Sequence, residues 1–276
     1  MVIDSHHHFW KYTEAEYGWI DESMSAIKRD FVAEDLRESI EAAGVDGVIS
    51  VHARQTLEET HWLLSIANDN KFIRGVVGWV PLISERVKID LEAVAADPKL
   101  RGVRHVIHDE ADEQYIARED FNRGISLLKE FRLAFDILIF ERQLPAAIRF
   151  VDRHPDQIFV LDHLAKPNIK AAEREPWAKN IKEIARRPNV YCKVSGMVTA
   201  ADWQNWTQQQ LREYFDVALE AFGIERLMAG SDWPVCLLAC GYKRWWAILR
   251  QWMAEMSEEH NERFFALNAI KAYGLS

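Results

Sequence analysis

Short apolar runs alternate along the chain with longer amphipathic segments. The run at 133–140 is almost wholly apolar, which is typical of a strand buried on both faces. The first run begins at Val2 and leads into a cluster of histidines. Counting this one, we expect eight strands, the others at 45–52, 73–80, 101–107, 133–140, 158–164, 190–195 and 226–232.

Helical patterns fill the segments between these runs. Gly44 ends the first helix, and Thr56 with Glu59 forms a capping-box pattern at the start of the second. Ser84 is a typical N-cap for the third. Helices are expected at 32–43, 56–70, 84–96, 119–131, 144–154, up to about 187, and at 202–222, 242–256 and 258–273.

This alternation of strands and helices predicts the fold class. It indicates parallel strands, and eight of them in a chain of 276 residues indicate a closed α/β barrel, the (β/α)8 TIM barrel. An open doubly wound sheet is the alternative, but no Gly-x-Gly-x-x-Gly turn follows any predicted strand. No linker divides the chain, so residues 1–276 are expected to form a single domain with an extra C-terminal helix.

Composition and charge narrow the choice of partner. The net charge of −9 disfavours nucleic acid and anionic membrane surfaces. No apolar run approaches the roughly 20 residues that span a bilayer, and no signal-peptide pattern precedes the first strand. Three cysteines, Cys192, Cys236 and Cys240, fit a reducing compartment. We therefore expect a cytoplasmic protein that acts on a small molecule, with its oligomeric state left open.

Histidines at the end of the first strand are the first candidates for chemistry. Side chains alternate along a strand, so Asp4, His6 and His8 point one way and His7 the other. Two imidazoles on one face can reach a single metal ion or one substrate oxygen. An aromatic stretch that includes Trp10 and Trp19 follows, and we interpret it as a long loop covering a cleft.

The other predicted strands also end in polar residues, and the active site of a parallel barrel lies at these ends. Salt bridges at the barrel rim can account for residues such as Arg104 and Lys193. They account poorly for three histidines and an aspartate on the first, sixth and eighth strands, of which the first and eighth are neighbours. The candidate site is therefore His6, His8, His163 and Asp232. Asp4 and Asp162 are expected to orient neighbouring histidines, and His52 and His105 to line or pack the cleft.

Several motifs resemble one known group of enzymes, the lactonase branch of the amidohydrolase superfamily. Within that branch the chain is most similar to sugar lactonases of the L-fuconolactonase and L-rhamnonolactonase type. The resemblance spans the whole chain, and its first and last motifs together are specific for the group. The motifs are Ile3-Asp4-Ser5-His6-His7-His8-Phe9-Trp10, Gly102-Val103-Arg104-His105, Val160-Leu161-Asp162-His163-Leu164-Ala165-Lys166-Pro167, Lys193-Val194-Ser195-Gly196 and Gly230-Ser231-Asp232-Trp233-Pro234-Val235.

The resemblance implies that His6, His8, His163 and Asp232 are the central four residues. The fourth strand lacks the bridging Lys or Glu, and the fifth lacks the His, that two-metal members of the superfamily carry. A two-metal site is therefore not expected. A single Zn²⁺ on these four residues and a metal-free site both remain open.

The hypothesis that follows is hydrolysis of a sugar lactone to the aldonic acid. Asp232 would take a proton from water, and the three histidines would polarise the carbonyl directly or through one metal. The substrate is expected to be neutral, because a dicarboxylate would want several Arg side chains for bidentate binding. Residues expected to bind it are Arg104, Lys193 and His108, with Trp10, Trp79 and Trp233 as apolar walls.

Two alternatives stay open at this point. A metal-dependent deaminase or decarboxylase could use the same barrel, and such an enzyme would need a firmly held metal. A ligand-binding barrel that has lost its chemistry is the more remote alternative, because a binding protein has no need for an activated water.

Overall fold

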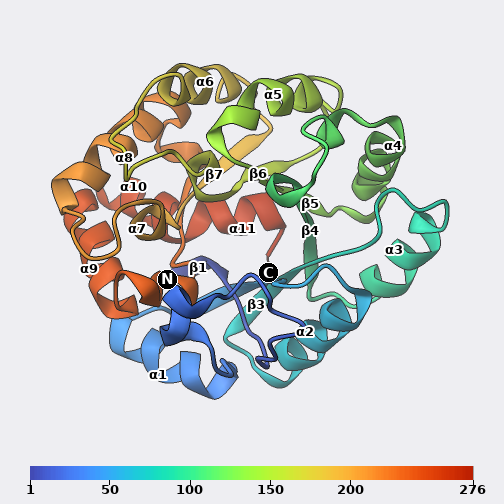
Figure 1. The fold of residues 1–276 in the computed structure, drawn as a ribbon, viewed down its shortest axis with the longest axis horizontal. Helices are drawn as coiled ribbons and strands as arrows, with labels where there is room; N and C mark the ends of the chain where they lie inside the picture. Colours follow the sequence, from blue (N-terminus) through green and yellow to red (C-terminus); the bar gives the residue numbers. More distant parts are fainter. Residues whose placement is uncertain (276) are drawn as a thin grey trace.

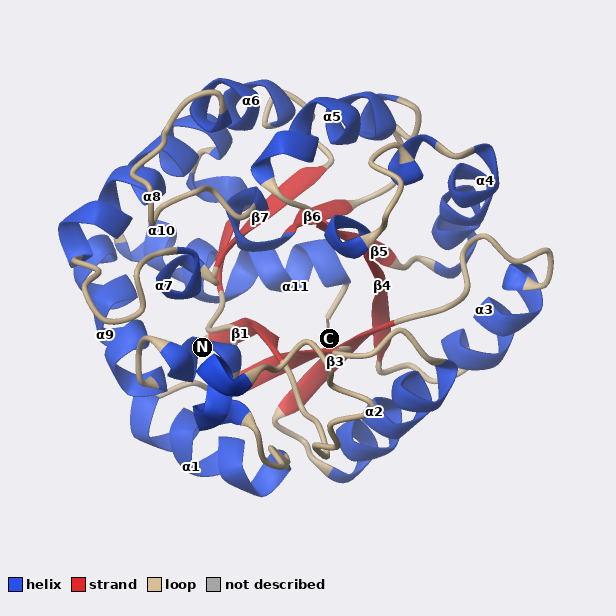
Figure 2. Cartoon of the chain, viewed as in Figure 1, coloured by secondary structure: helices blue, strands red, loops and turns tan. Residues whose placement is uncertain are grey.

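The computed structural model describes residues 1–275, and they form a (β/α)8 barrel (Figures 1 and 2). All neighbouring strands pair in parallel in the order β1 to β8, as predicted. Backbone bonds from Asp232 N to His6 O (2.8 Å) and from His8 N to Trp233 O (2.6 Å) join the ends of β8 and β1. The strands are β1 Ile3–His7, β2 Gly47–Val51, β3 Ile73–Gly78, β4 Leu100–Val106, β5 Ala134–Leu138, β6 Phe159–Leu161, β7 Val190–Val194 and β8 Leu227–Ala229.

Helices surround the strands and pack their apolar faces against them (Figure 2). None of the described helices combines the length and the hydropathy needed to cross a membrane. The helices are α1 Ala33–Ala43, α2 Leu57–Asp69, α3 Val87–Ala95, α4 Glu119–Leu127, α5 Leu144–Asp152, α6 Trp177–Ile184, α7 Met197–Ala200, α8 Gln208–Phe222, α9 Tyr242–Met253, α10 Glu258–Glu262 and α11 Asn268–Tyr273.

The C-terminal helix α11 closes one end of the barrel. It lies across the ring of strands in Figure 2, and Ala269, Ala272 and Tyr273 pack against interior strand residues such as Ile49 and Met228. This apolar plug seals the end at which the strands begin. The barrel is therefore accessible to a ligand from the opposite end, where the strands finish.

Two predicted strands end earlier than expected. The backbone of β6 leaves the sheet after Leu161 and runs through left-handed conformations from His163 (φ 53°) to Lys166 (φ 47°). The strand β8 ends at Ala229, and three residues later Asp232 also adopts a left-handed conformation, with a φ of 59°. Left-handed residues cannot continue a strand, so both segments turn at the residues that face the cleft.

At the start of α2, only one residue of the predicted capping pair, Thr56, caps the helix as expected. Thr56 accepts from the backbone N–H of Glu59 at 3.1 Å, as expected. The Glu59 carboxylate reaches further back and accepts from the N–H groups of Ala53 (2.6 Å) and Arg54 (2.7 Å). Buried Glu59 thus fixes the loop between β2 and α2, which forms part of the cleft wall.

Candidate active site

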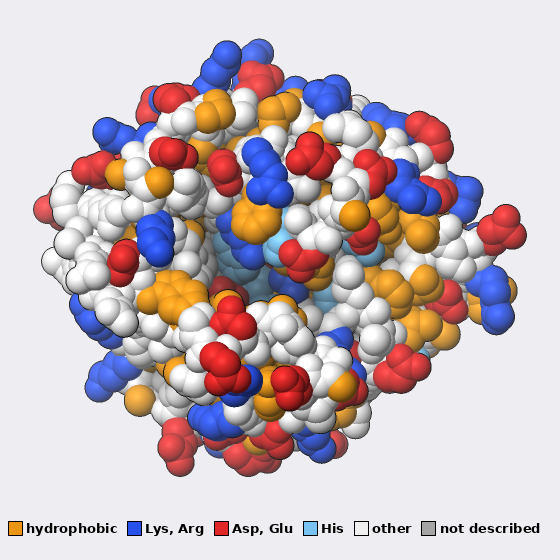
Figure 3. Space-filling view, in the orientation of Figure 1, with side chains coloured by type: hydrophobic (Ala, Val, Ile, Leu, Met, Phe, Trp, Pro, Cys, Tyr) orange, Lys and Arg blue, Asp and Glu red, His pale blue; other side chains and the backbone are white. Residues whose placement is uncertain are grey.

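A cleft opens at the end of the barrel where the strands finish. Figure 3 shows it as a hollow in the centre of this face, with histidine surfaces at its base. Its main lobe has a volume of about 670 Å³, and a second lobe of about 470 Å³ adjoins it. Both volumes lie in the range of small-molecule sites. The lobes share Trp19, Met24, His163, Lys166, Asp232 and Val235.

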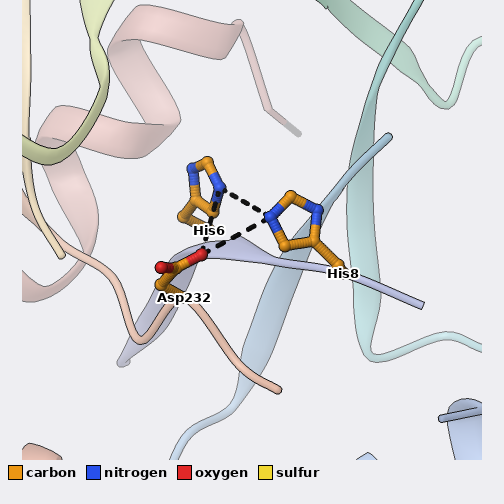
Figure 4. A group of neighbouring side chains, drawn as sticks. All are labelled: His6, His8 and Asp232. Atoms are coloured by element: carbon orange, nitrogen blue, oxygen red, sulfur yellow. Dashed lines mark hydrogen bonds and ion pairs between the residues drawn. The ribbon is translucent and has the colours of Figure 1, made fainter. Parts of the chain in front are cut away.

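Four polar side chains converge at the base of the cleft, where the barrel strands end. Because they lie on this rim of the barrel, we call them the rim cluster: His6, His8, His163 and Asp232. The Nε2 atoms of His6 and His8 lie 3.1 Å apart (Figure 4). Asp232 Oδ1 lies 3.5 Å from Nε2 of His8, 3.8 Å from Nε2 of His6 and 3.9 Å from Nε2 of His163. The structure thus brings together all four residues singled out from the sequence.

Strand alternation separates the three consecutive histidines at the end of β1. His6 and His8 face the cluster, whereas the Nε2 atom of His7 lies 2.8 Å from Ser50 Oγ on the other side. The His7 ring packs edge-on against Phe9. His7 therefore belongs to the packing between barrel and helices, as its position in the strand predicted.

Strained backbone aims two members of the rim cluster. Left-handed non-glycine residues such as His163 and Asp232 cost roughly 1–3 kcal/mol each and persist where surrounding contacts impose them. Gly196 (φ 64°) lies against the His163 ring, where a Cβ atom would approach Nδ1 to 2.7 Å. Glycine is required there by both the conformation and the space.

Contacts to the Nδ1 atoms of His8 and His163 orient their Nε2 atoms toward the cluster. His8 Nδ1 lies 2.8 Å from the carbonyl oxygen of Val51, which can only accept a hydrogen bond, so Nδ1 carries the proton and Nε2 offers a lone pair to the cluster. His163 Nδ1 lies 2.8 Å from Ser195 Oγ. Partners of this kind fix the ring orientation of catalytic and metal-binding histidines.

Electrostatics keep the rings of His6 and His163 neutral and the Asp232 carboxylate charged. Burial lowers the pKa of His6 well below its usual value and that of His163 to about 4. Burial also raises the pKa of Asp232, but His163, His8 and Lys166 outweigh this effect and leave its pKa below the usual value. At neutral pH His6 and His163 are therefore neutral and lie beside a charged Asp232 carboxylate.

The donor set fits a divalent metal such as zinc. Bonds of about 2.0–2.1 Å to a tetrahedral zinc ion place two ligand atoms about 3.3 Å apart. The separations of these atoms within the rim cluster, 3.1 to 3.9 Å, bracket that value. The ligand atoms of His6, His8 and Asp232 all lie within 4.8 Å of one another.

Beneath the rim cluster lies a second set of charged groups, the floor network: Arg104, Asp136, Asp162, Lys193 and Tyr273. Lys193 Nζ lies 2.5 Å from Asp136, 2.9 Å from Asp162 Oδ1 and 3.1 Å from His6 Nδ1. Tyr273 of α11 donates to Asp136 (2.8 Å), and Arg104 donates to Asp162 (3.2 Å). This network is sealed from solvent, except for the slightly exposed Arg104.

Comparison with known proteins agrees with this geometry. The family model described as "Amidohydrolase" matches residues 3–275. The chain belongs to the amidohydrolase family. An L-fucono-1,5-lactonase from Burkholderia multivorans is 38% identical over 290 residues, covering 100% of this chain and 96% of the relative. An L-rhamnono-gamma-lactonase from Scheffersomyces stipitis is 24% identical over 64% of this chain and 59% of its own length.

Solved structures extend the comparison. An amidohydrolase from Burkholderia multivorans with bound HEPES superimposes with a TM-score of 0.96 at 36% identity, covering 100% of both chains. A second crystal form of an amidohydrolase from the same organism, with bound zinc, has a TM-score of 0.94 at 38% identity, again over 100% of both chains. A zinc-bound structure so close in fold is consistent with the fit of the donor set in this amidohydrolase.

Only some of the residues predicted to bind substrate line the cleft. Arg104 and His108 line the main lobe of the cleft. Lys193 does not, because its side chain is fully buried below His6 and paired with Asp136. The structure thus corrects the expectation that its ammonium touches the substrate. Asp162 contacts His6 Nδ1 at 3.4 Å, whereas Asp4 binds Ser231 rather than a histidine ring.

The predicted tryptophan walls are also corrected. None of the three lines either lobe. Trp10 is buried behind His8, Trp79 donates to His105 Nδ1 at 3.2 Å, and Trp233 packs edge-on against Phe31. Their indoles support the site from behind.

The aromatic loop after β1 supplies the wall instead. Trp19, 43% exposed, lines both lobes, and Glu16 and Met24 of the same segment reach the cleft. The expectation that this loop covers a cleft is confirmed. The sequence contains no signal that separates Trp19 from Trp10, because both lie in the same aromatic stretch.

Lys166 is a cleft residue that the sequence reasoning missed as a candidate. It lines both lobes, and among residues 1–275 no carboxylate lies within ion-pairing distance of its ammonium. Its Nζ lies 5.5 Å from the centroid of the Phe140 ring. The signal was its place in the motif, three residues after His163 at the end of a strand.

Proposed function

We propose that this amidohydrolase is a lactonase that opens a sugar lactone to the aldonic acid. The observation that carries the proposal is the rim cluster itself, in which the Asp232 carboxylate meets three histidines at the base of an open cleft. The full-length similarity to an L-fucono-1,5-lactonase points to the same reaction. Ester hydrolysis needs both an activated water and a polarised carbonyl, and this set of side chains is suited to supply them.

Asp232 is the general base of the proposed reaction. Its Oδ1 faces the histidine rings, and the proton of the attacking water passes to its carboxylate. Its lowered pKa keeps the carboxylate ionised at neutral pH, ready to accept that proton. The same carboxylate then returns the proton to the alkoxide oxygen that leaves as the ring opens.

A single divalent metal is proposed as the cofactor, held by the four residues of the rim cluster. When bound, such an ion polarises the lactone carbonyl and lowers the pKa of a bound water. His8 and His163 contribute by presenting Nε2, because Val51 and Ser195 hold their outer nitrogens.

The charges of the cleft suit a neutral substrate. Its main lobe is lined by three cations and three carboxylates, so it has no excess of either sign. Arg54 pairs with Glu16 and Glu59, and Arg104 pairs with Asp162. Lys166 alone among these cations lacks a paired carboxylate in the described chain, so it is suited to the carbonyl oxygen or to the carboxylate formed in the product. Arg104, His108 and Trp19 would contact the ring substituents.

A cytoplasmic location is part of the proposal. Cys192, Cys236 and Cys240 are all free and buried. Free thiols of this kind are typical of proteins in a reducing compartment.

A panel of lactones tests the proposed function. The panel contains neutral aldonolactones, L-fucono-1,5-lactone among them, and a carboxylated pyrone lactone, with acid release followed by a pH indicator. We expect hydrolysis of at least one aldonolactone and little of the carboxylated compound. Efficient hydrolysis of the pyrone lactone together with inactivity on every aldonolactone would refute the proposal.

A further inference from the structure

A second group of side chains below the rim cluster has the spacing of a cation site. Ligand atoms of His6, Asp162 and His163 all lie within 4.8 Å of one another, and all three residues are buried. This group shares His6 and His163 with the rim cluster. Two cations side by side could in principle use the two groups together, as in two-metal hydrolases.

Lys193 already fills this second place. Its Nζ lies 2.9 Å from Asp162 Oδ1 and 3.1 Å from His6 Nδ1, so it contacts two of the three residues in the group. We propose that the Lys193 ammonium is a built-in second cation, which limits the site to one metal ion. The inference concerns metal stoichiometry and does not depend on the lactone being the substrate.

The charge balance of the floor supports this role. Two carboxylates, Asp136 and Asp162, are matched there by two cations, Lys193 and Arg104. A divalent ion placed beside them would meet an ammonium at contact distance in a region of low dielectric, where like charges repel strongly. Without Lys193, the same two carboxylates would attract a cation.

The ammonium is also held so that it cannot swing away. Lys193 is fully buried and donates to Asp136 at 2.5 Å. Asp136 is fixed in turn by the hydroxyl of Tyr273, at 2.9 and 2.8 Å from its two oxygens. The C-terminal helix α11 that plugs the barrel thus anchors the internal cation.

One consequence concerns His6, which both groups share. Its Nδ1 faces Lys193 and Asp162, and its Nε2, 3.1 Å from Nε2 of His8, faces the rim cluster. His6 therefore serves the rim cluster and is withheld from a second ion.

Metal analysis of matched variants tests the inference. Wild-type protein, K193M and K166M are loaded with excess Zn²⁺, desalted and analysed for zinc per polypeptide. Methionine keeps the length of the lysine stem but removes the charge. We expect K193M to hold one equivalent more than wild type, whereas K166M, the same substitution in the cleft, matches wild type and controls for surface binding.

K193M leaves two buried carboxylates without their shared cation, so the double variant D136N/K193M, which removes one of them, is measured in parallel. A folded K193M or D136N/K193M with the same zinc content as wild type would overturn the inference. More than one equivalent in the wild type would do so as well, and this result stands even if neither variant folds. Activity plays no part in the readout, so an unexpected substrate leaves the test intact.

Discussion

The rim cluster and the floor network lie against each other in one barrel and share His6, yet their polar atoms are partnered in opposite ways. In the rim cluster, the Nε2 atoms of three histidines and one Asp232 oxygen converge on one point beside an open cleft. In the floor network, every carboxylate touches a cation, and both carboxylates and Lys193 are fully buried. Polar side chains that converge beside an open cleft indicate the catalytic centre, whereas buried charges that are paired with one another indicate a structural role.

The rim cluster and the floor network also differ in their effect on the stability of the folded protein. Buried charges are tolerated when they are paired and hydrogen-bonded, so the floor network can stabilise the barrel while remaining closed. The rim cluster adds backbone strain at His163 and Asp232 and brings four polar side chains close together. Such arrangements weaken the folded state and are kept where they serve function.

The largest effect expected on stability comes from Asp162→Asn. Burial raises the pKa of Asp162, but Lys193, His6 and Arg104 outweigh it and hold the pKa well below its usual value. Removing this charge breaks several buried contacts at once and should cost about 3–5 kcal/mol of unfolding free energy. Urea unfolding at pH 7.5 measures it.

Asp136→Asn is the matched control for this prediction. Burial raises the pKa of Asp136 to about 6 despite the nearby Lys193, so its charged form is held less firmly. We expect a clearly smaller loss than for D162N. Equal losses in the two variants would show that the floor network does not depend on the charge of Asp162.

A smaller effect, on activity, is expected from Lys166→Met. Loss of the unpaired cation of the cleft removes a charged contact to the carbonyl or the product carboxylate, which should lower kcat/KM by about 10- to 100-fold. Lys166→Arg keeps the charge and should retain more activity. Steady-state kinetics on an aldonolactone measure both variants, and undiminished kcat/KM in K166M would place the ammonium outside the reaction.

Tyr273→Phe tests whether the floor network acts through stability alone. The change deletes the hydroxyl that binds Asp136 and should lower the unfolding free energy by about 1.5 kcal/mol. The kcat/KM of the folded variant should stay within about threefold of wild type, because Tyr273 does not line the cleft. A large kinetic defect with normal stability would contradict the division of roles.

The smallest effect concerns pH and His108 in the cleft wall. Burial and the nearby Lys166 and Arg104 lower its pKa to about 2, although Asp109 lies 3.1 Å from its Nε2. The unfolded chain takes up a proton at this histidine below about pH 6.5 and the folded chain does not, so folding weakens as pH falls. His108→Asn should remove about 1 kcal/mol of the stability loss between pH 7.5 and 5.5, measured by urea unfolding. An unchanged loss would mean that His108 charges in the folded state.

Much of the fold was predictable, because the apolar runs are short, regular and separated by helical patterns. The ends of β6 and β8 were not. The chain turns left-handed at His163 and Asp232, shortly after Leu161 and Ala229 end these strands, and neither position carries a glycine or asparagine that would predict such a turn.

The site was predictable where residue type and strand end coincide, as at His6, His8, His163 and Asp232. Its surroundings were not. Lys193 and Lys166 both lie near strand ends, but only the structure shows that Asp136, a lone acid in an otherwise apolar run, draws Lys193 inward. Which tryptophan faces the cleft depends on the path of a loop, which residue patterns do not encode.

Activity of the Asp232→Asn variant is the most direct test of the account. Asparagine keeps the size of the side chain and one oxygen toward the histidines but cannot accept the proton of water. We predict that kcat/KM for an aldonolactone falls by about 10²–10⁴-fold, with thermal unfolding close to that of the wild type. Near-wild-type hydrolysis by a folded D232N protein would contradict the assignment of the rim cluster as the catalytic centre.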